Sequence, residues 1–296
     1  METWGLDWKS LHSENSKLIV LQISGYGANT TLRDRPGLGK VGEAMSGVVE
    51  ITGWPDGPPV HTGFSHADTV TGLMGAFAVM AAAYRRRTDP DFDGEWIDLA
   101  LFEPIYRLIE WQVITHDQLN IVPRRAGNQM AVTPAAVVNT YLSADDHWIT
   151  VTSASVKAVC KIVAMLGEPV EEYDTADKQR DRSGQLDEML RGWIRSVTRE
   201  EALAALTDAA VVASKIYTMD DIVDDETYRE RGDVISVDDQ DFGTVRMQGV
   251  IPKLSKHPGS VWRSGPSVGE DNDFVYKKLL GMADDELDRL HADGVI

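Results

Sequence analysis

The stretch Gly63-Phe-Ser-His-Ala-Asp68-Thr-Val-Thr-Gly72 precedes an apolar segment that ends in Arg85-Arg-Arg87. Apolar residues at helical spacing and many alanines predict a helix here, and the arginines suit the negative end of its dipole. The pattern places Asp68 at the helix N-cap, facing free backbone N–H groups. Asp68 is then either a cap alone or a nucleophile that needs no general base, because aspartates are ionised near neutral pH.

Composition limits the classes of function open to the 296-residue chain. It carries 47 acidic and 29 basic side chains, a net charge of −18, which would repel a phosphate backbone and disfavours nucleic-acid binding. Cys160 is the only cysteine, so an internal disulfide is excluded. No two histidines lie at metal-binding spacing on a predicted helix, and we expect no metal site.

Targeting signals are not evident in the sequence. The N-terminal segment is polar and charged, and the longest mainly apolar run, Gly72–Ala83, is shorter than the about 20 residues that a membrane span needs. We therefore expect a cytoplasmic protein that does not enter a membrane.

The remaining pattern predicts an α/β protein. The nearly continuous apolar run Leu18–Ser24 is typical of a strand in a buried parallel sheet. Further predicted elements are helices at about 41–50 and 102–119, strands at 95–101 and 211–216, hairpins over 137–152 and 234–248, and a helix opened by a capping box at Thr198. We expect a large α/β domain over residues 1–125, a small α+β domain over 126–250, and a tail over 251–296 that returns to the large domain.

Several short blocks of sequence occur in a distinctive order. They are Ile23-Ser-Gly-Tyr-Gly27, Arg33-Asp-Arg-Pro-Gly37, Ala44-Met-Ser-Gly47, Thr52-Gly-Trp-Pro-Asp-Gly-Pro-Pro59, Ala67-Asp68 and Gly94-Glu-Trp-Ile-Asp-Leu-Ala-Leu101, with further blocks from Lys253 to Ile296. In this order the series resembles the class III CoA-transferases of the CaiB/BaiF type over essentially the whole chain.

The resemblance implies a fold and a chemistry. Family members form interlocked dimers of ring-like chains, each with a Rossmann-like large domain and a smaller α+β domain. Asp68 matches the family's catalytic aspartate, which forms a covalent aspartyl-CoA thioester while CoA moves between carboxylic acids. A CoA thioester is thus a substrate, and no tightly bound cofactor is expected. The resemblance places Pro36, Gly37, Leu38 and Gly39 against the pantetheine end, and Gly127, Asn128 and Gln129 near the acyl group.

The chain also departs from the family pattern. Met1 aligns just after the family's N-terminal nucleotide-binding lobe, so we expect either a homodimer or a hetero-oligomer with a chain that supplies this lobe. A non-catalytic or half-site subunit is the alternative function. A 2-methylacyl-CoA racemase is the third, and Leu38 counts against it because the related racemases have a histidine there. The loop Gly127–Thr133 lacks the glycine run of oxalate-using members, so oxalate is not favoured, and the acids remain open.

Overall fold

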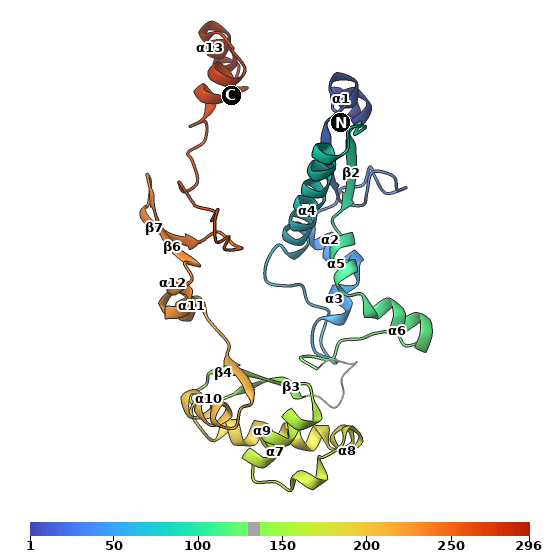
Figure 1. Cartoon of the computed structure of the whole chain (residues 1–296), viewed down its shortest axis with the longest axis vertical. Helices are drawn as coiled ribbons and strands as arrows, with labels where there is room; N and C mark the ends of the chain where they lie inside the picture. Colours follow the sequence, from blue (N-terminus) through green and yellow to red (C-terminus); the bar gives the residue numbers. More distant parts are fainter. Residues whose placement is uncertain (130–136) are drawn as a thin grey trace. The chain divides into compact units, whose positions relative to one another are not determined.

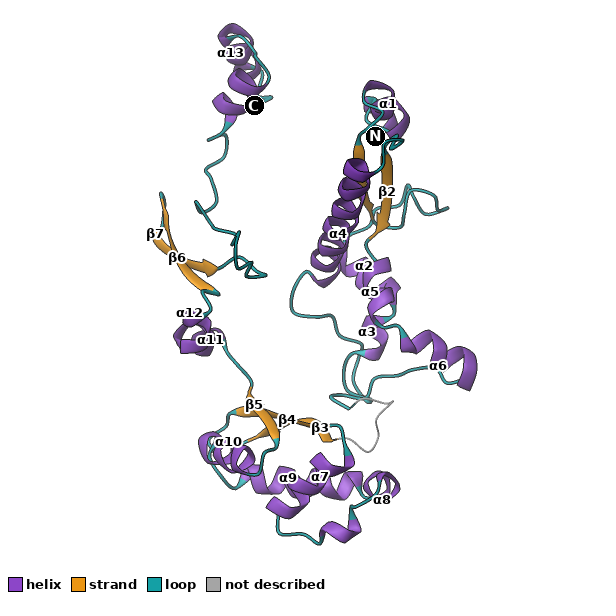
Figure 2. Cartoon of the chain, in the orientation of Figure 1, coloured by secondary structure: helices purple, strands orange, loops and turns teal. Residues whose placement is uncertain are grey.

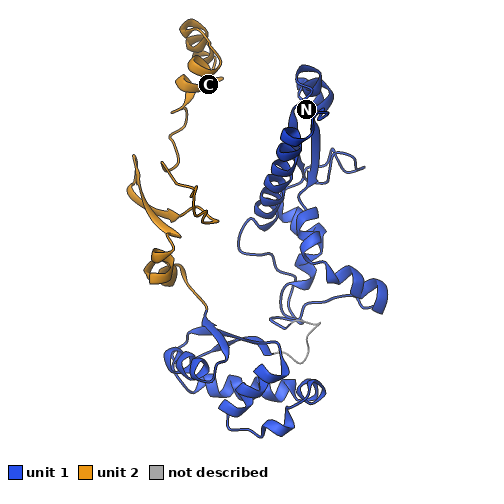
Figure 3. Cartoon of the chain, viewed as in Figure 1, with its two compact units in different colours: residues 1–215 blue, residues 216–296 orange. Residues whose placement is uncertain are grey.

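The computed structural model describes residues 1–129 and 137–296 (Figure 1). Helices accompany one parallel and two antiparallel sheets, which confirms the predicted mixed α/β class (Figure 2). The chain divides into two compact units, residues 1–215 and 216–296 (Figure 3). The expected boundaries after residues 125 and 250 remain predictions.

The first lobe is built on two parallel strands and the helix that connects them. Its elements are a 3₁₀ turn (Glu2–Trp4), α1 (Trp8–Glu14), β1 (Ile19–Ser24), α2 (Gly39–Ser46), α3 (Val48–Ile51), α4 (His66–Thr88), β2 (Glu95–Ala100), α5 (Glu103–Leu108) and α6 (Trp111–Leu119). β1 and β2 pair in parallel from Ile19 opposite Glu95 to Ser24 opposite Ala100. This confirms the parallel sheet predicted from the apolar run.

Two helices expected to be continuous are each broken in the structure. Gly47 has φ +90°, a left-handed conformation that glycine adopts readily, and it separates α2 from α3. The expected helix 102–119 divides into α5 and α6 at Ile109 and Glu110, where no glycine or proline occurs. Ile109 Cδ1 lies 3.4 Å from the position of an added Cβ at Gly47, so this second break coincides with a tertiary contact to α2.

Helix α4 has one face against the sheet and one face open. An added Cβ at Gly75 would lie 2.7 Å from Leu21 Cδ2, so the glycine lets α4 lie close on β1. The open face carries an apolar stripe at helical spacing: Leu73, Phe77, Met80 and Tyr84. Among the described residues, α4 is the one helix that is long and apolar enough to span a membrane. Core helices of soluble proteins can also be this long and apolar. The expected absence of a span stays a prediction.

Residues 137–215 form an antiparallel sheet covered by helices. The strands β3 (Val137–Leu142), β4 (Trp148–Ser153) and β5 (Val212–Lys215) pair in that order, and the helices are α7 (Val156–Met165), α8 (Ala176–Asp181), α9 (Ser183–Arg195) and α10 (Arg199–Asp208), with a 3₁₀ turn at Val170–Glu172. The predicted hairpin and the capping box at Thr198 are both confirmed. A continuous apolar cluster, which includes Ile149, Ile162 and Leu190, fills this lobe.

Residues 216–296 contain little core. Their elements are α11 (Met219–Asp224), α12 (Glu226–Glu230), β6 (Val234–Asp239), β7 (Gly243–Gln248), a π-helical stretch (Asp273–Leu279) and α13 (Asp284–Ala292). The predicted pairing of β6 with β7 is confirmed. Leu287 is the one buried hydrophobic side chain in this unit, whereas Phe242, Ile251 and Trp262 are largely exposed. A unit of this size therefore lacks the buried apolar surface that normally stabilises a domain.

A carboxylate joins the sheet and α9 in the 137–215 lobe. Asp187 accepts hydrogen bonds from Asn139 Nδ2 (2.9 Å), Tyr141 Oη (2.8 Å) and Arg191 Nη2 (2.7 Å). Burial opposes ionisation, but these hydrogen bonds outweigh it and hold the pKa of Asp187 below its ordinary value. Burial, together with Asp187, raises the pKa of the Tyr141 hydroxyl. Asp187 is thus ionised at neutral pH and accepts hydrogen bonds from three side chains at once.

We expect Asp187→Asn to destabilise this lobe by about 1–3 kcal/mol, because buried donors lose a charged acceptor. Folding lowers the pKa of Asp187, so its contribution is present above the ordinary aspartate pKa and is lost as the pH falls through the lowered value. Urea unfolding of the full chain across the acid range would measure both effects. The control is Asp177→Asn, which removes an exposed ion pair with Arg180 and should change stability by less than about 0.5 kcal/mol. Equal stability of the Asp187 variant and the wild type would contradict the prediction.

Candidate active site

Asp68 lies in the first turn of α4, not at its N-cap. The helix begins at His66, and Ser65 is the N-cap residue, although its side chain makes no capping hydrogen bond. Asp68 is the third helical residue, so the predicted capping role is wrong. The helix starts three residues earlier than predicted, because the Thr69 N–H already donates to the Ser65 carbonyl (3.0 Å). A carboxylate in a first helical turn still faces the positive end of the dipole.

The carboxylate of Asp68 packs against the start of a second helix. Leu38 is the N-cap residue of α2, and Gly39 is its first residue. A Cβ at Gly39 would overlap Oδ2 of Asp68 and lie 2.7 Å from its Cγ, so only a glycine leaves room for this carboxylate. The first N–H groups of any helix lack intrahelical acceptors. The geometry thus places Asp68 beside the free N–H ends of two helices, α2 and α4.

The Asp68 carboxylate is open to a reactant. Asp68 is exposed, and within residues 1–129 and 137–296 the structure records no hydrogen bond or ion pair to its carboxylate. Leu38, beside it at the start of α2, is 76% exposed and carries no group that could exchange a proton. A carboxylate without a bound partner and next to unfilled N–H groups can attack an electrophilic carbon. The neighbouring N–H groups can stabilise an oxyanion that forms there.

The loop between β1 and α2 brings residues 36–39 to the Asp68 carboxylate. An added Cβ at Gly25 would lie 2.8 Å from Gly37 Cα, so the two glycines bring the ends of the loop together. Asp98, on β2, accepts hydrogen bonds from the Ala28 N–H at 2.9 and 3.1 Å. The loop is therefore anchored to the sheet, and Pro36 lies exposed just before α2.

Gly127, Asn128 and Gln129 lie in a different environment. The Gly127 N–H donates to the Gly53 carbonyl (2.9 Å), and an added Cβ would lie 2.5 Å from Trp54. Asn128 Nδ2 donates to Thr140 Oγ1 (2.7 Å) on β3, and Gln129 is exposed. None of the contacts recorded among the described residues joins this turn to Asp68. The structure thus brings residues 38 and 39 to Asp68, whereas the remainder of the loop Gly127–Thr133, residues 130–133, lies outside the described residues.

A buried ionic cluster forms around Glu43, one turn after the first residue of α2. Glu43 is fully buried, and its carboxylate accepts hydrogen bonds from Lys40 Nζ (2.9 Å) and His61 Nδ1 (2.8 Å). Burial opposes ionisation of Glu43, but the bonds from Lys40 and His61 outweigh it and hold its pKa below the ordinary range. We call these three residues the Glu43 cluster.

The Glu43 cluster leaves only a weak signature in the sequence. The available signal was Lys40 and Glu43 at i, i+3 on a helix otherwise rich in small residues, a spacing that places two side chains on one face. Pairing with His61 across a turn gives no local signal.

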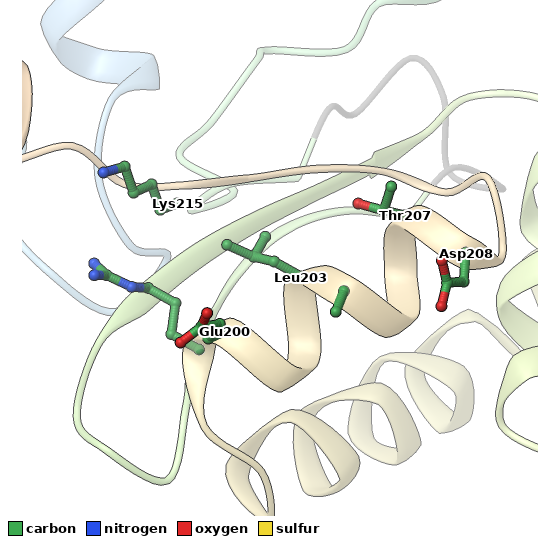
Figure 4. Close-up of a pocket in the computed structure, with 7 residues that line it drawn as sticks. Glu200, Leu203, Thr207, Asp208 and Lys215 are labelled. Carbon is green, nitrogen blue, oxygen red and sulfur yellow. The ribbon is translucent and has the colours of Figure 1, made fainter. Parts of the chain in front are cut away.

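Two hollows recorded among the described residues are lined by residues other than the predicted site residues. A hollow of about 480 Å³ runs along α10, lined by Glu200, Leu203, Thr207 and Asp208, with Lys215 at the end of β5 (Figure 4). A second, of about 500 Å³, lies at the carboxyl end of β1. In the described part of the chain, no group of three His, Cys, Asp or Glu side chains could hold a metal ion.

Comparison with known proteins identifies relatives along the whole chain. The profile of CoA-transferase family III matches residues 1–272. Succinyl-CoA–D-citramalate CoA-transferase of Chloroflexus aurantiacus is 31% identical over 301 residues, which are 100% of this chain and 74% of the relative. The beta subunit of succinyl-CoA–L-malate CoA-transferase of the same organism is 31% identical, with the same shares covered. A crystal structure of a CaiB/BaiF family protein from Brucella suis superposes with a TM-score of 0.77 at 25% identity, covering 94% of this chain and 72% of that one.

We expect Gly39→Ala to lower the rate of CoA transfer by about 10- to 100-fold, because the new methyl group displaces the Asp68 carboxylate. Asp68 is exposed and can rotate away, so the thermal midpoint should change little. The matched control is Gly72→Ala in α4, where an added Cβ meets nothing within 4 Å and should stabilise the helix by about 1 kcal/mol. Steady-state rates and thermal unfolding of both variants test this, and full activity in Gly39→Ala would contradict it.

Proposed function

The chain belongs to CoA-transferase family III, and on that premise we propose that it transfers CoA between carboxylic acids through a covalent intermediate on Asp68. One observation carries the choice of residue. Asp68 has an exposed carboxylate that no described residue pairs with, and Gly39 places it at the starts of α2 and α4.

The Asp68 carboxylate is the one group of the protein that forms and breaks covalent bonds in the proposed reaction. Asp68 attacks the acyl carbon of the donor, the C–S bond breaks, and a mixed anhydride and CoA thiolate form. The thiolate then attacks the aspartyl carbon, which releases the donor acid and leaves aspartyl-CoA. The acceptor carboxylate reacts with this thioester, and the thiolate released attacks the new acyl group and regenerates Asp68. In each step a carboxylate or a thiolate that is already ionised attacks a carbonyl carbon, so no step needs a general base.

Negative charge develops on a carbonyl oxygen in every step. Gly39, the first residue of α2, lies against the Asp68 carboxylate, and we propose that the free N–H groups of this helix start donate to this oxygen. The exposed Leu38 side chain offers an apolar surface to the thioester. It offers no proton acceptor, which disfavours the racemase alternative.

We propose succinyl-CoA as the donor. Two relatives that are each 31% identical over the chain carry succinyl-CoA in their names, with D-citramalate and L-malate as the acceptors. A hydroxy dicarboxylic acid is the corresponding class of acceptor for this chain.

We expect succinyl-CoA and hydroxylamine together to convert Asp68 into a hydroxamate, because hydroxylamine traps an activated aspartyl group. Peptide mass spectrometry would locate the change. Asp68→Asn should give no hydroxamate and should lose transfer activity by about 10³-fold or more, since it removes the nucleophile. A hydroxamate at another carboxylate, or an unmodified Asp68 with succinyl-, acetyl- and benzoyl-CoA, would contradict the proposal.

We further propose that the chain works in an assembly, as the interlocked dimer of its family or with a longer homologous chain. Two surfaces support this: the apolar stripe on α4, and residues 216–296, which bury only Leu287. One relative is itself named as a beta subunit, which keeps the half-site alternative open for this chain. A homodimer that is fully active alone would exclude that alternative.

We expect the double variant Leu73→Asp with Phe77→Asp to disrupt the assembly, because two charges would replace apolar contact area. Sedimentation velocity would show a smaller species than the wild type. Arg86→Gln, an exposed change on the same helix, is the control and should sediment as the wild type does. An unchanged sedimentation coefficient in the double variant would show that this stripe is not an interface.

A further inference from the structure

Glu43 is a buried carboxylate for which the transfer reaction gives no direct role. It has no exposed surface, and the other buried residues of α2 are Gly39, Gly42 and Ser46. A buried charge strongly destabilises a protein unless it is paired and hydrogen-bonded. The partners of Glu43 therefore explain why α2 can carry an acid at this position.

Lys40 is the partner that reaches beyond the cluster. Its ammonium donates to Glu43 Oε1 (2.9 Å), to the Thr62 carbonyl (2.8 Å) and to the Phe64 carbonyl (2.9 Å). An ammonium has three N–H donors, so all three are used. One side chain thus connects the first turn of α2 to the loop that leads into α4.

His61 holds the same loop from its other end. Its Nδ1 lies 2.8 Å from Glu43 Oε2, and because a carboxylate only accepts, Nδ1 carries the proton. Glu43 therefore fixes both Lys40 and His61, and through them residues 61–64. These residues end immediately before Ser65, the N-cap of α4.

The two helix starts that Glu43 connects are the ones that meet at the nucleophile. Lys40 follows Gly39, whose Cα lies against the Asp68 carboxylate. The Phe64 carbonyl accepts both from Lys40 and from the His66 N–H (2.8 Å), at the first residue of α4. Any movement of this loop would thus change the position of Asp68 relative to α2.

We propose that Glu43 is a positioning residue that acts through Lys40 and His61 to hold the Asp68 carboxylate at the start of α2. This inference rests on the proposed function, because it assigns the cluster a part in the reaction at Asp68. Glu43 does not touch the reacting atoms. It keeps the nucleophile and the N–H groups of α2 at a separation that suits the developing oxyanion, where a small misplacement has a large effect on rate.

The variant Glu43→Gln tests this, because it keeps the size of the side chain and removes the charge that holds Lys40. We expect the maximal rate of Asp68 hydroxamate formation with succinyl-CoA to fall by about 10- to 100-fold. The half-saturating concentration of succinyl-CoA should change by less than about threefold, since the substrate contacts remain. Hydrogen exchange in a peptide covering residues 61–68 should become about tenfold faster or more, as the loop opens locally.

Two further variants separate positioning from stability. Glu95→Gln removes an exposed ion pair with Arg85 near the other end of α4, and should leave the rate and the exchange of residues 61–68 unchanged. Lys40→Met combined with Glu43→Gln removes both charges together, which a fold tolerates better than one unpaired buried charge. This double variant should be as slow as Glu43→Gln with a thermal midpoint near that of the wild type.

The outcomes distinguish the two proposals. If the wild type forms the hydroxamate and Glu43→Gln forms it at the same rate, the positioning role is refuted and the proposed function stands. If the wild type forms none, the proposed function is refuted, and the positioning role is refuted with it. A rise in half-saturating concentration without a fall in maximal rate would assign Glu43 to substrate binding, against the inference.

Discussion

The contact between the first turns of α2 and α4 is the constraint on which the first lobe depends. Gly39 can touch the Asp68 carboxylate only if both helices enter at the same edge of the sheet. The parallel pairing of β1 with β2 provides this, because α4 crosses over between them and packs on β1 through Gly75. Gly42 also packs closely on Leu101, where an added Cβ would lie 3.0 Å from the backbone. Three glycines thus set how closely α2 and α4 pack, and with it where the Asp68 carboxylate lies.

Much of the fold of residues 1–215 could be predicted from local pattern. The apolar run at residues 18–24, the long alanine-rich helix and the hairpin of residues 137–153 each carry a periodicity that identifies the element. The family could be identified because its motifs occur in order along the chain. The sequence points to Asp68 by two routes, its place near the start of a helix and the motif around it, and its role as a nucleophile stays a prediction.

What could not be predicted depends on contacts between distant residues. The exact start of α4 shifted Asp68 from the N-cap into the first turn, because helix ends are the least determined part of any pattern. The break at Ile109 coincides with packing against Gly47 and has no breaker residue of its own. The Glu43 cluster joins residues 18 positions apart through a turn, so neither charge pattern nor periodicity indicates that the acid is buried.

The lobe of residues 137–215 and the second unit, residues 216–296, differ in what stabilises them. Residues 137–215 have a continuous apolar core with a satisfied carboxylate at Asp187, whereas residues 216–296 bury one leucine. A chain that has not yet assembled would present this second unit to the cell with little buried core, and weakly stabilised segments are the ones that proteases and chaperones reach first. The cellular lifetime of the polypeptide would then be set by how soon it is assembled, so an excess of one unmatched subunit would be removed rather than accumulate.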